Sequence, residues 1–251
     1  MNNQRKIWTR AGAIALALAV WQAAAMAVNM EMFLASPLQV LQRLGVIWRT
    51  PGFSGTLLFS ALRVMGGFLC AFILGTALGI LAGRAPWLET LLWPYVVTIK
   101  TVPVASFIIL CLVWFSFTKL TILISFLIAF PVIYTNVLQG MKSMDPEMLE
   151  MARVYRVPWR RQLYYLYLPG LMPFLTSASG VSVGMAWKAG VAAEVIGIVN
   201  GSIGEKLYES KIYFENADLL SWTIMIILLS VAGEKIFVWL LKAAFRRLVR
   251  R

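Results

Sequence analysis

The chain alternates long apolar runs with short polar segments. The apolar runs cover about residues 11–29, 57–83, 91–115, 120–140, 166–198 and 219–241. Each is close to or above the roughly 20 residues that a helix needs to cross the hydrocarbon of a bilayer. Such runs form helices, because a backbone in lipid must satisfy its own hydrogen bonds. The pattern predicts an all-α membrane protein with about six transmembrane helices.

We expect one membrane domain over residues 1–251. The first span and an amphipathic segment that starts at Ser36, expected at the outer interface, occupy residues 1–54. The remaining spans occupy residues 55–245 and include the longest polar interval, residues 140–169. The chain shows no internal repeat, so any two-fold symmetry must come from a second copy or a homologous subunit.

The first apolar run has two interpretations. Arg5, Lys6 and Arg10 precede an alanine-rich core that ends in AAAMA, and this pattern also fits a secretory signal peptide. The run is longer than the core of a typical signal peptide, which favours a retained transmembrane helix.

Composition narrows the chemistry that this chain can perform. Hydrophobic residues make up 60% of it and charged residues 14%, whereas soluble domains are about 25% charged. It contains no histidine, which excludes histidine-based metal sites and histidine-assisted nucleophilic catalysis. It also lacks the G-x-x-x-x-G-K-[ST] loop that binds ATP. We therefore expect no catalytic residue, metal or cofactor in this chain, and any ATP hydrolysis would belong to another subunit.

The distribution of basic residues predicts the orientation. With the N-terminus inside, fourteen Lys and Arg side chains fall on the inner side and five on the outer side, as the positive-inside rule requires. Both termini are therefore expected in the cytoplasm. The net charge of +12 suits anionic lipid head groups, and its spread along the inner face argues against nucleic-acid binding. The inner residues are Arg5, Lys6, Arg10, Arg84, Lys142, Arg153, Arg156, Arg160, Arg161, Lys242, Arg246, Arg247, Arg250 and Arg251.

The polar interval predicts a helix on the inner side. Asp145 is a favourable N-cap, Pro146 suits the first helical position, and Glu147 suits the positive end of the helix dipole. We expect this helix to run from Pro146 to about Tyr155 or Arg156.

A second helix is expected after a break. Pro158 disfavours helical geometry at Val157 and can itself begin a helix that runs toward the membrane. The first helix carries an apolar stripe, which fits either docking on a soluble partner or lying on lipid head groups. The stripe consists of Met148, Met151 or Ala152, and Tyr155.

The same interval carries a spaced motif. It reads Glu150-Met151-Ala152, three residues, Arg156, nine residues, then Leu166-Tyr167-Leu168-Pro169. This order resembles the EAA signature of permease subunits in binding-protein-dependent ABC importers. Most of the chain is similar to the nitrate/sulfonate/taurine type of these permeases. The supporting stretches are LASPLQVLQRL, SALRVMGGFLCAFILGTALGILAGR, KTVPVASFIILCLVWF and GMAWKAGVAAEVIG.

The resemblance implies a type I ABC importer permease in a bacterial-type inner (plasma) membrane. It implies two ATPase subunits that bind ATP and Mg, a second permease copy and an external substrate-binding protein. The substrate implied is a small anion such as a sulfonate, taurine or nitrate, with a vitamin precursor or another small organic solute as the alternative. An ion-driven secondary transporter is a weaker alternative, because the chain lacks inverted repeats.

The resemblance also assigns an ATPase-coupling role to the polar interval, with Glu150 organising the elbow between its helices. Arg156 stands where the family has a glycine, and arginine adopts a positive φ only at a cost. We therefore expect Pro158 to supply the break instead. The residues expected to couple are Glu150, Met151, Ala152, Arg153, Tyr155, Arg156 and Pro158.

The translocation path is predicted from residues that are unusual inside spans. Lys100 lies about 15 Å deep by the helical rise, where a charge is costly. It would either attract an anionic substrate or pair with a buried carboxylate such as Glu194 or Glu234. Pro103 is expected to kink or break the third span, and Pro131 the fourth. The predicted path residues are Lys100, Pro103, Trp187, Lys188 and Glu194, with interfacial packing as the alternative for Trp187 and snorkelling for Lys188.

Overall fold

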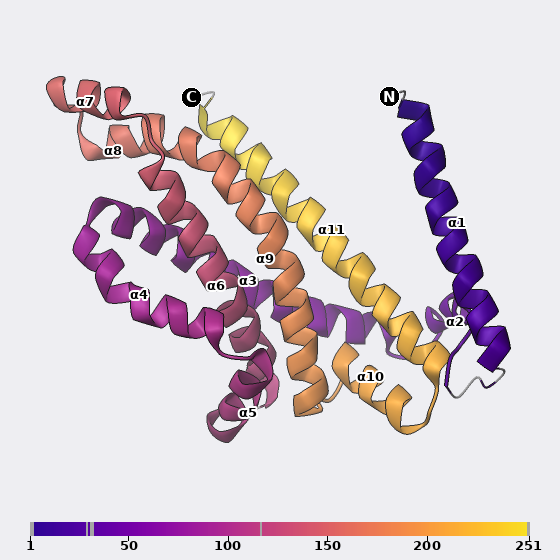
Figure 1. The fold of residues 1–251 in the computed structure, drawn as a ribbon. Coiled ribbons are helices and arrows are strands. Elements are labelled where there is room, and N and C mark those ends of the chain that lie inside the picture. The colour runs from indigo at the N-terminus through magenta and orange to yellow at the C-terminus, as the bar shows by residue number, and fades with distance from the viewer. Residues whose placement is uncertain (1–2, 29, 31–32, 116, 250–251) are drawn as a thin grey trace.

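The computed structural model describes residues 3–28, 30, 33–115 and 117–249. These residues form helices and no strand, which confirms the all-α prediction. The helices are α1 (Asn3–Val28), α2 (Pro37–Ile47), α3 (Phe53–Arg84), α4 (Pro86–Thr101), α5 (Val104–Trp114), α6 (Phe117–Lys142), α7 (Pro146–Val154), α8 (Trp159–Gln162), the π-helical η1 (Leu163–Tyr167), α9 (Leu168–Gly197), α10 (Ile203–Ile212) and α11 (Asn216–Val249) (Figure 1).

In the described chain, five helices are long and apolar enough to cross a membrane. The pair α4 and α5 makes a sixth crossing only as a broken span, bent by 105°. The third predicted span is therefore not one straight helix. The bend expected at Pro103 is present, since Val102 before it is extended at ψ 131°. The second expected kink, at Pro131, does not interrupt α6.

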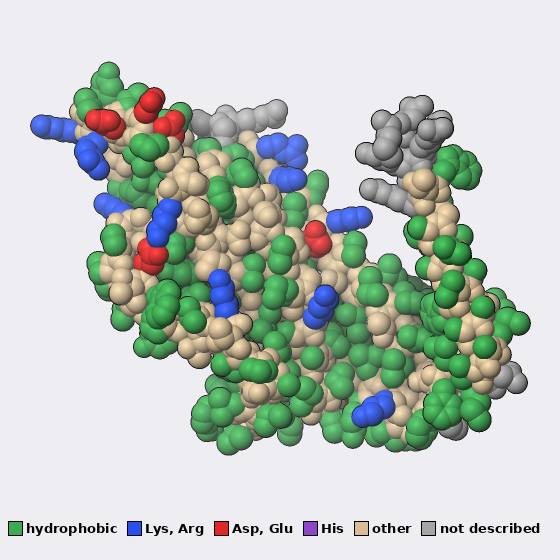
Figure 2. Space-filling view, in the orientation of Figure 1, with side chains coloured by type: hydrophobic (Ala, Val, Ile, Leu, Met, Phe, Trp, Pro, Cys, Tyr) green, Lys and Arg blue, Asp and Glu red, His purple; other side chains and the backbone are tan. Residues whose placement is uncertain are grey.

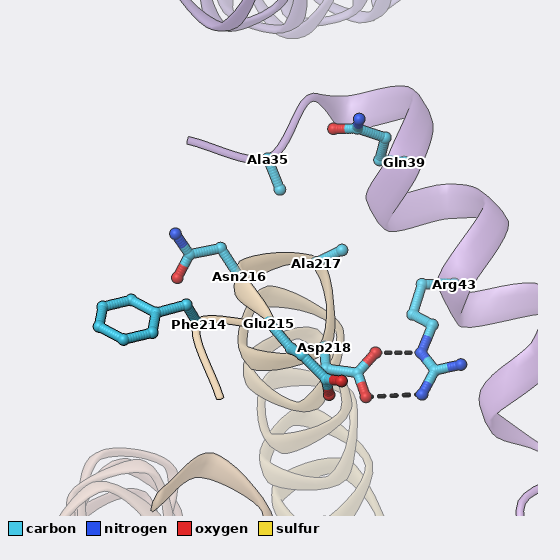
Figure 3. Close-up of a pocket in the computed structure, with 8 residues that line it drawn as sticks. All are labelled: Ala35, Gln39, Arg43, Phe214, Glu215, Asn216, Ala217 and Asp218. Atoms are coloured by element: carbon cyan, nitrogen blue, oxygen red, sulfur yellow. Dashed lines mark hydrogen bonds and ion pairs between the residues drawn. The ribbon is translucent and has the colours of Figure 1, made fainter. Parts of the chain in front are cut away.

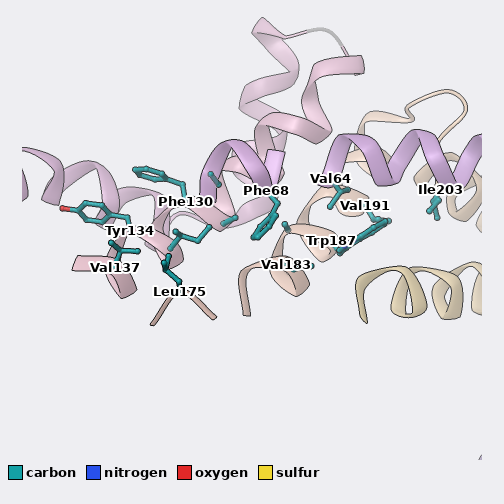
Figure 4. Packing of buried hydrophobic residues seen from close by; sticks show 14 of the residues in the cluster. Val64, Phe68, Phe130, Tyr134, Val137, Leu175, Val183, Trp187, Val191 and Ile203 are labelled. Carbon is teal, nitrogen blue, oxygen red and sulfur yellow. The ribbon is translucent and has the colours of Figure 1, made fainter. Parts of the chain in front are cut away.

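The core lies where α3, α6 and α9 pack together. Val64 and Phe68 of α3 meet Trp187 of α9 in this cluster (Figure 4). Close approach of α3 and α6 depends on glycine: a Cβ on Gly67 would lie 2.3 Å from the Ile122 carbonyl oxygen. This agrees with the preference of membrane helix interfaces for small residues.

The molecule has two distinct ends. The N-terminal end of α1, the C-terminal end of α11 and the α7–α8 loop lie at one end, and α5 and α10 lie at the other (Figure 1). We call these the α7 end and the α10 end. Acidic and basic side chains gather around α7, above a broad hydrophobic face (Figure 2). The described ends of α1 and α11 therefore lie on the same side of the molecule as the α7–α8 loop.

The segment between α9 and α11 contains a short helix, α10. The Ser202 side chain caps α10 by accepting from the Glu205 backbone N–H at 3.0 Å. Ser202 lies in a glycine-rich stretch outside any apolar periodicity, so its sequence context hardly indicates a helix cap.

The first apolar run forms α1, which stands apart from the bundle (Figure 1). Only 6% of its apolar window is buried. It is tethered near α2, where Trp21 Nε1 donates to the Ala35 carbonyl at 3.1 Å. The amphipathic segment predicted at Ser36 is α2, and Ser36 and Gln39 form its capping box.

Candidate coupling site and membrane-embedded polar residues

The start of α7 follows the sequence prediction. Asp145 is the N-cap, and its carboxylate accepts from the Glu147 backbone N–H at 2.9 Å. Pro146 occupies the first turn, where its missing N–H costs nothing. The helix ends at Val154, within two residues of the predicted end.

Arg156 itself makes the turn after α7, with φ at +49°. The Val157 N–H donates to the Ala152 carbonyl at 2.9 Å and the Arg156 N–H to the Arg153 carbonyl at 3.0 Å. These two bonds form a Schellman motif, which satisfies carbonyls at the end of the helix. The expectation that arginine would avoid positive φ here was wrong, because both bonds hold the residue in the position that the family gives to glycine.

The chain then restarts at Pro158, which is extended and caps α8. We call Tyr155–Pro158 the elbow. The break predicted at Pro158 is thus present together with the turn at Arg156, and no helix runs through 154–160.

A π-helical turn connects α8 to α9. The Leu168 N–H reaches back five residues to the Leu163 carbonyl. Pro169 follows at once and has no N–H to donate, while its ring would clash with the carbonyl four residues earlier. A wider turn before Pro169 relieves that clash.

The α7–α8 loop presents an apolar surface to solvent. Met151 is 56% exposed and Tyr155 75%, although both are large hydrophobic residues. A groove of about 380 Å³ runs between α7 and the start of the following helix. It is lined by Met148, Met151, Ala152, Tyr155, Val157, Arg161, Gln162, Tyr165 and Leu166.

The charged face of α7 lies away from this groove. Glu150 and Arg153 are exposed on α7 outside the groove lining, and neither side chain pairs with another described residue. A projecting helix with an exposed apolar groove and unpaired charges suits contact with a folded protein. The structure brings the predicted coupling residues onto one projecting loop, with Ala152 buried at its base.

The predicted path residues differ in their surroundings. Lys100 is exposed in the last turn of α4, just before the bend, and its Nζ lies 3.4 Å from Thr135 Oγ1. It pairs with neither Glu194 nor Glu234 in the described chain. Lys188 is exposed on α9.

Trp187 and Glu194 lie inside the bundle. Trp187 is 2% exposed and packs in the core rather than at an interface (Figure 4). Glu194 is fully buried near the end of α9. These placements leave the transport roles of both residues as predictions.

Glu194 joins four helices. Ser60 Oγ of α3 donates to its Oε2 at 2.8 Å, and the Gly204 N–H of α10 approaches the same oxygen at 3.3 Å. Thr121 Oγ1 of α6 lies 3.4 Å from Oε1. Ser60 Oγ also accepts from the Ile203 N–H at 2.9 Å. Sequence reasoning missed Ser60 and Thr121, because a lone hydroxyl in an apolar span usually bonds its own helix.

A polar pocket of about 450 Å³ lies where α2 meets the start of α11 (Figure 3). Arg43 and Asp218 form a two-pronged ion pair there, with Nη2 donating to Oδ2 at 2.7 Å. The pair fastens α2 to α11. The hydrogen bonds to Asp218 raise the pKa of the Arg43 guanidinium, so the arginine remains charged.

The fold, with its long apolar helices, broken span and projecting α7–α8 loop, is that of a polytopic membrane protein. A family model described as "binding-protein-dependent transport system inner membrane component" matches residues 75–250. The chain belongs to this family and is a permease subunit of an ABC importer.

Curated relatives agree with the family. The chain is 28% identical to the putative aliphatic sulfonates transport permease protein SsuC of Bacillus subtilis, over 94% of this chain and 83% of that protein. It is 28% identical to the taurine transport system permease protein TauC of Escherichia coli, over 78% and 74%. It is 27% identical to the nitrate import permease protein NrtB of Synechocystis sp., over 76% and 72%. The resemblance read from the motifs is confirmed.

Proposed function

We propose that this permease imports a small oxyanion and is driven through its α7–α8 loop by separate ATPase subunits. The observation that carries the proposal is the exposed apolar surface of α7, with Met151 and Tyr155 beside the groove. A charged, half-apolar helix held out from a membrane protein needs a partner of matching shape. The family supplies the class of that partner, since its members work with ATPase and substrate-binding proteins.

The proposed assembly has further subunits. Two ATPase subunits bind ATP and Mg and engage the α7 end, which lies in the cytoplasm with both termini. An external binding protein delivers substrate at the α10 end. A second copy of this chain completes the path, and the exposed apolar surface of α1 and α11 leaves room for lipid and for that copy.

ATP binding would close the ATPase subunits and draw the two α7 helices together. The permease pair would then turn from inward-open to outward-open, because ATP binds one state better than the other. Hydrolysis resets the pair.

The anion class rests on the relatives and on one feature of this chain. Sulfonates, taurine and nitrate appear in the names of the relatives. Lys100 adds an exposed cation at a bend within a span, where a positive charge favours an anion over a neutral solute.

Uptake in proteoliposomes tests the proposal. The permease is reconstituted with its ATPase and binding protein and offered labelled taurine, an alkanesulfonate and nitrate. ATP-dependent uptake of one anion, with no uptake driven by an ion gradient alone, supports the proposal. Uptake of only a neutral vitamin precursor would contradict the anion class.

Glu150→Lys tests the coupling surface. The reversed charge should separate ATP turnover from uptake while the permease stays in the membrane. Glu215→Lys makes the same charge change at the α10 end and should leave retention of the ATPase intact. Unchanged uptake with Glu150→Lys would count against docking on α7.

A further inference from the structure

The ring of Trp159 links α3 to the far side of the π-helical turn. Trp159 is the first residue of α8, directly after the elbow. The guanidinium carbon of Arg84, the last residue of α3, lies 4.2 Å from the centre of a Trp159 ring. The side chain of Trp159 also contacts Tyr167, with 5.2 Å between the ring centres and 53° between the ring planes. We call these three residues the elbow stack.

The elbow stack spans the π-helical turn η1. Between Trp159 and Tyr167 the chain passes through η1, where hydrogen bonds span five residues. Such turns are rare and less stable than an α-helical turn. Without a contact across η1, this turn would deform when α8 moves. The contact between Trp159 and Tyr167 joins the residue that begins α8 to the last residue of η1.

Next to the elbow stack, α3 packs closely against α6. A Cβ on Gly79 would lie 2.8 Å from Val137 side-chain atoms, and one on Gly83 would lie 2.5 Å from Met141 Cβ. Because neither glycine has room for a Cβ, the α3 backbone lies directly against α6 near the Arg84 end. Movement of α3 at Arg84 would therefore displace α6.

The same helix reaches α10. Ser60 lies on α3 about 36 Å from Arg84 at the helical rise. Its hydroxyl accepts from the Ile203 N–H and donates to Glu194, which holds the start of α10. One continuous helix thus connects the elbow stack to the opposite end of the molecule.

We propose that Arg84 and Trp159 are positioning residues that carry movement of the docked α7–α8 loop through α3 to α10. This rests on the proposed docking of an ATPase on α7. Neither residue needs to touch the ATPase or the substrate. Their function is to make the elbow and α3 move together.

The test measures a change at α10 that depends on ATP bound at the α7 end. Cys70 and Cys111 are replaced by alanine, and Lys211, exposed on α10, by cysteine. The labelling rate of this cysteine by a maleimide is compared with and without nucleotide trapped by vanadate in the complex with the ATPase. Trapped nucleotide should change the rate when Trp159 and Arg84 are present.

Trp159→Ala should abolish this ATP-dependent difference while the ATPase still co-purifies and traps nucleotide. Arg84→Gln should reduce the difference about threefold, as expected for one cation–π contact. Trp159→Phe keeps a ring in place and should retain most of it. The double variant should be no worse than Trp159→Ala, because both changes break one contact.

Arg160→Gln is the matched control, since it removes an exposed charge from the same helix and should leave the difference intact. A full difference with Trp159→Ala, or equal loss with Arg160→Gln, would overturn the proposal. An unchanged rate in the parent protein would also overturn it, because α10 would then not respond to ATP. Loss of the ATPase from the parent complex would instead contradict the proposed docking.

Discussion

The backbone N–H of Val157 donates to the carbonyl of Ala152 at 2.9 Å, and this bond closes α7 around an arginine in the left-handed conformation. Left-handed geometry costs a residue with a side chain about 1–2 kcal/mol. The protein tolerates this cost at Arg156 because the Schellman motif satisfies carbonyls that would otherwise be unpaired at the end of α7. The elbow therefore keeps a glycine-like backbone without glycine.

Replacing Arg156 by glycine should stabilise the elbow. The strain at positive φ disappears, while glycine's greater freedom in the unfolded chain offsets part of the gain, so we expect up to about 1 kcal/mol. Hydrogen exchange of the Val157 amide in the isolated permease should slow by up to about fivefold.

In the control variant, the stability of the elbow should change in the opposite direction. Arg153→Gly places glycine inside α7, where it costs about 1 kcal/mol, and the same amide should exchange faster. Faster exchange with Arg156→Gly would show that the arginine side chain stabilises the elbow by a contact of its own.

Local patterns account for what could be predicted from the sequence. The spans follow from apolar run length, and the start of α7 follows from Asp145 and Pro146. The conformation of Arg156 was not predictable from propensity, because two backbone bonds outweigh it. The Ser60–Glu194 contact joins residues 134 positions apart, and no local pattern distinguishes Ser60 from a serine that bonds its own helix.

Ser60→Ala should destabilise the protein more than an equally buried serine elsewhere. The change leaves the Ile203 N–H without its partner and removes one donor from Glu194, so we expect a loss of about 1–3 kcal/mol. Thermal unfolding of the purified permease should show a lower midpoint. Ser182→Ala is the matched control, because the Ser182 hydroxyl bonds carbonyls of its own helix, Ala178 at 2.6 Å and Ser179 at 3.5 Å. Equal midpoints for the two variants would contradict the bridging role of Ser60.

Gly67→Ala should separate α3 from α6. The added Cβ would lie 2.3 Å from the Ile122 carbonyl oxygen and 2.8 Å from Ser125 Cβ, and neither atom is the flexible end of a side chain. Overpacking of this kind costs about 1–3 kcal/mol. The neighbouring Gly66→Ala meets nothing within 4 Å and should be neutral or slightly stabilising. Thermal unfolding of both variants in one detergent checks the difference, and a stable Gly67→Ala protein would show that α3 and α6 can shift apart.

Lys100→Gln should slow uptake of an anion without preventing ATP hydrolysis. The lysine is exposed in the last turn of α4, next to the bend, and its charge has no carboxylate partner in the described chain. Removing that charge removes an attraction that acts on a passing anion but not on the ATPase. We expect uptake per ATP to fall by about tenfold, with most of it restored in Lys100→Arg. Lys119→Gln, which removes an exposed charge near the start of α6, is the control and should leave uptake intact. If Lys100→Gln transports as fast as the parent, the lysine does not act on the substrate and its bond to Thr135 is its remaining role.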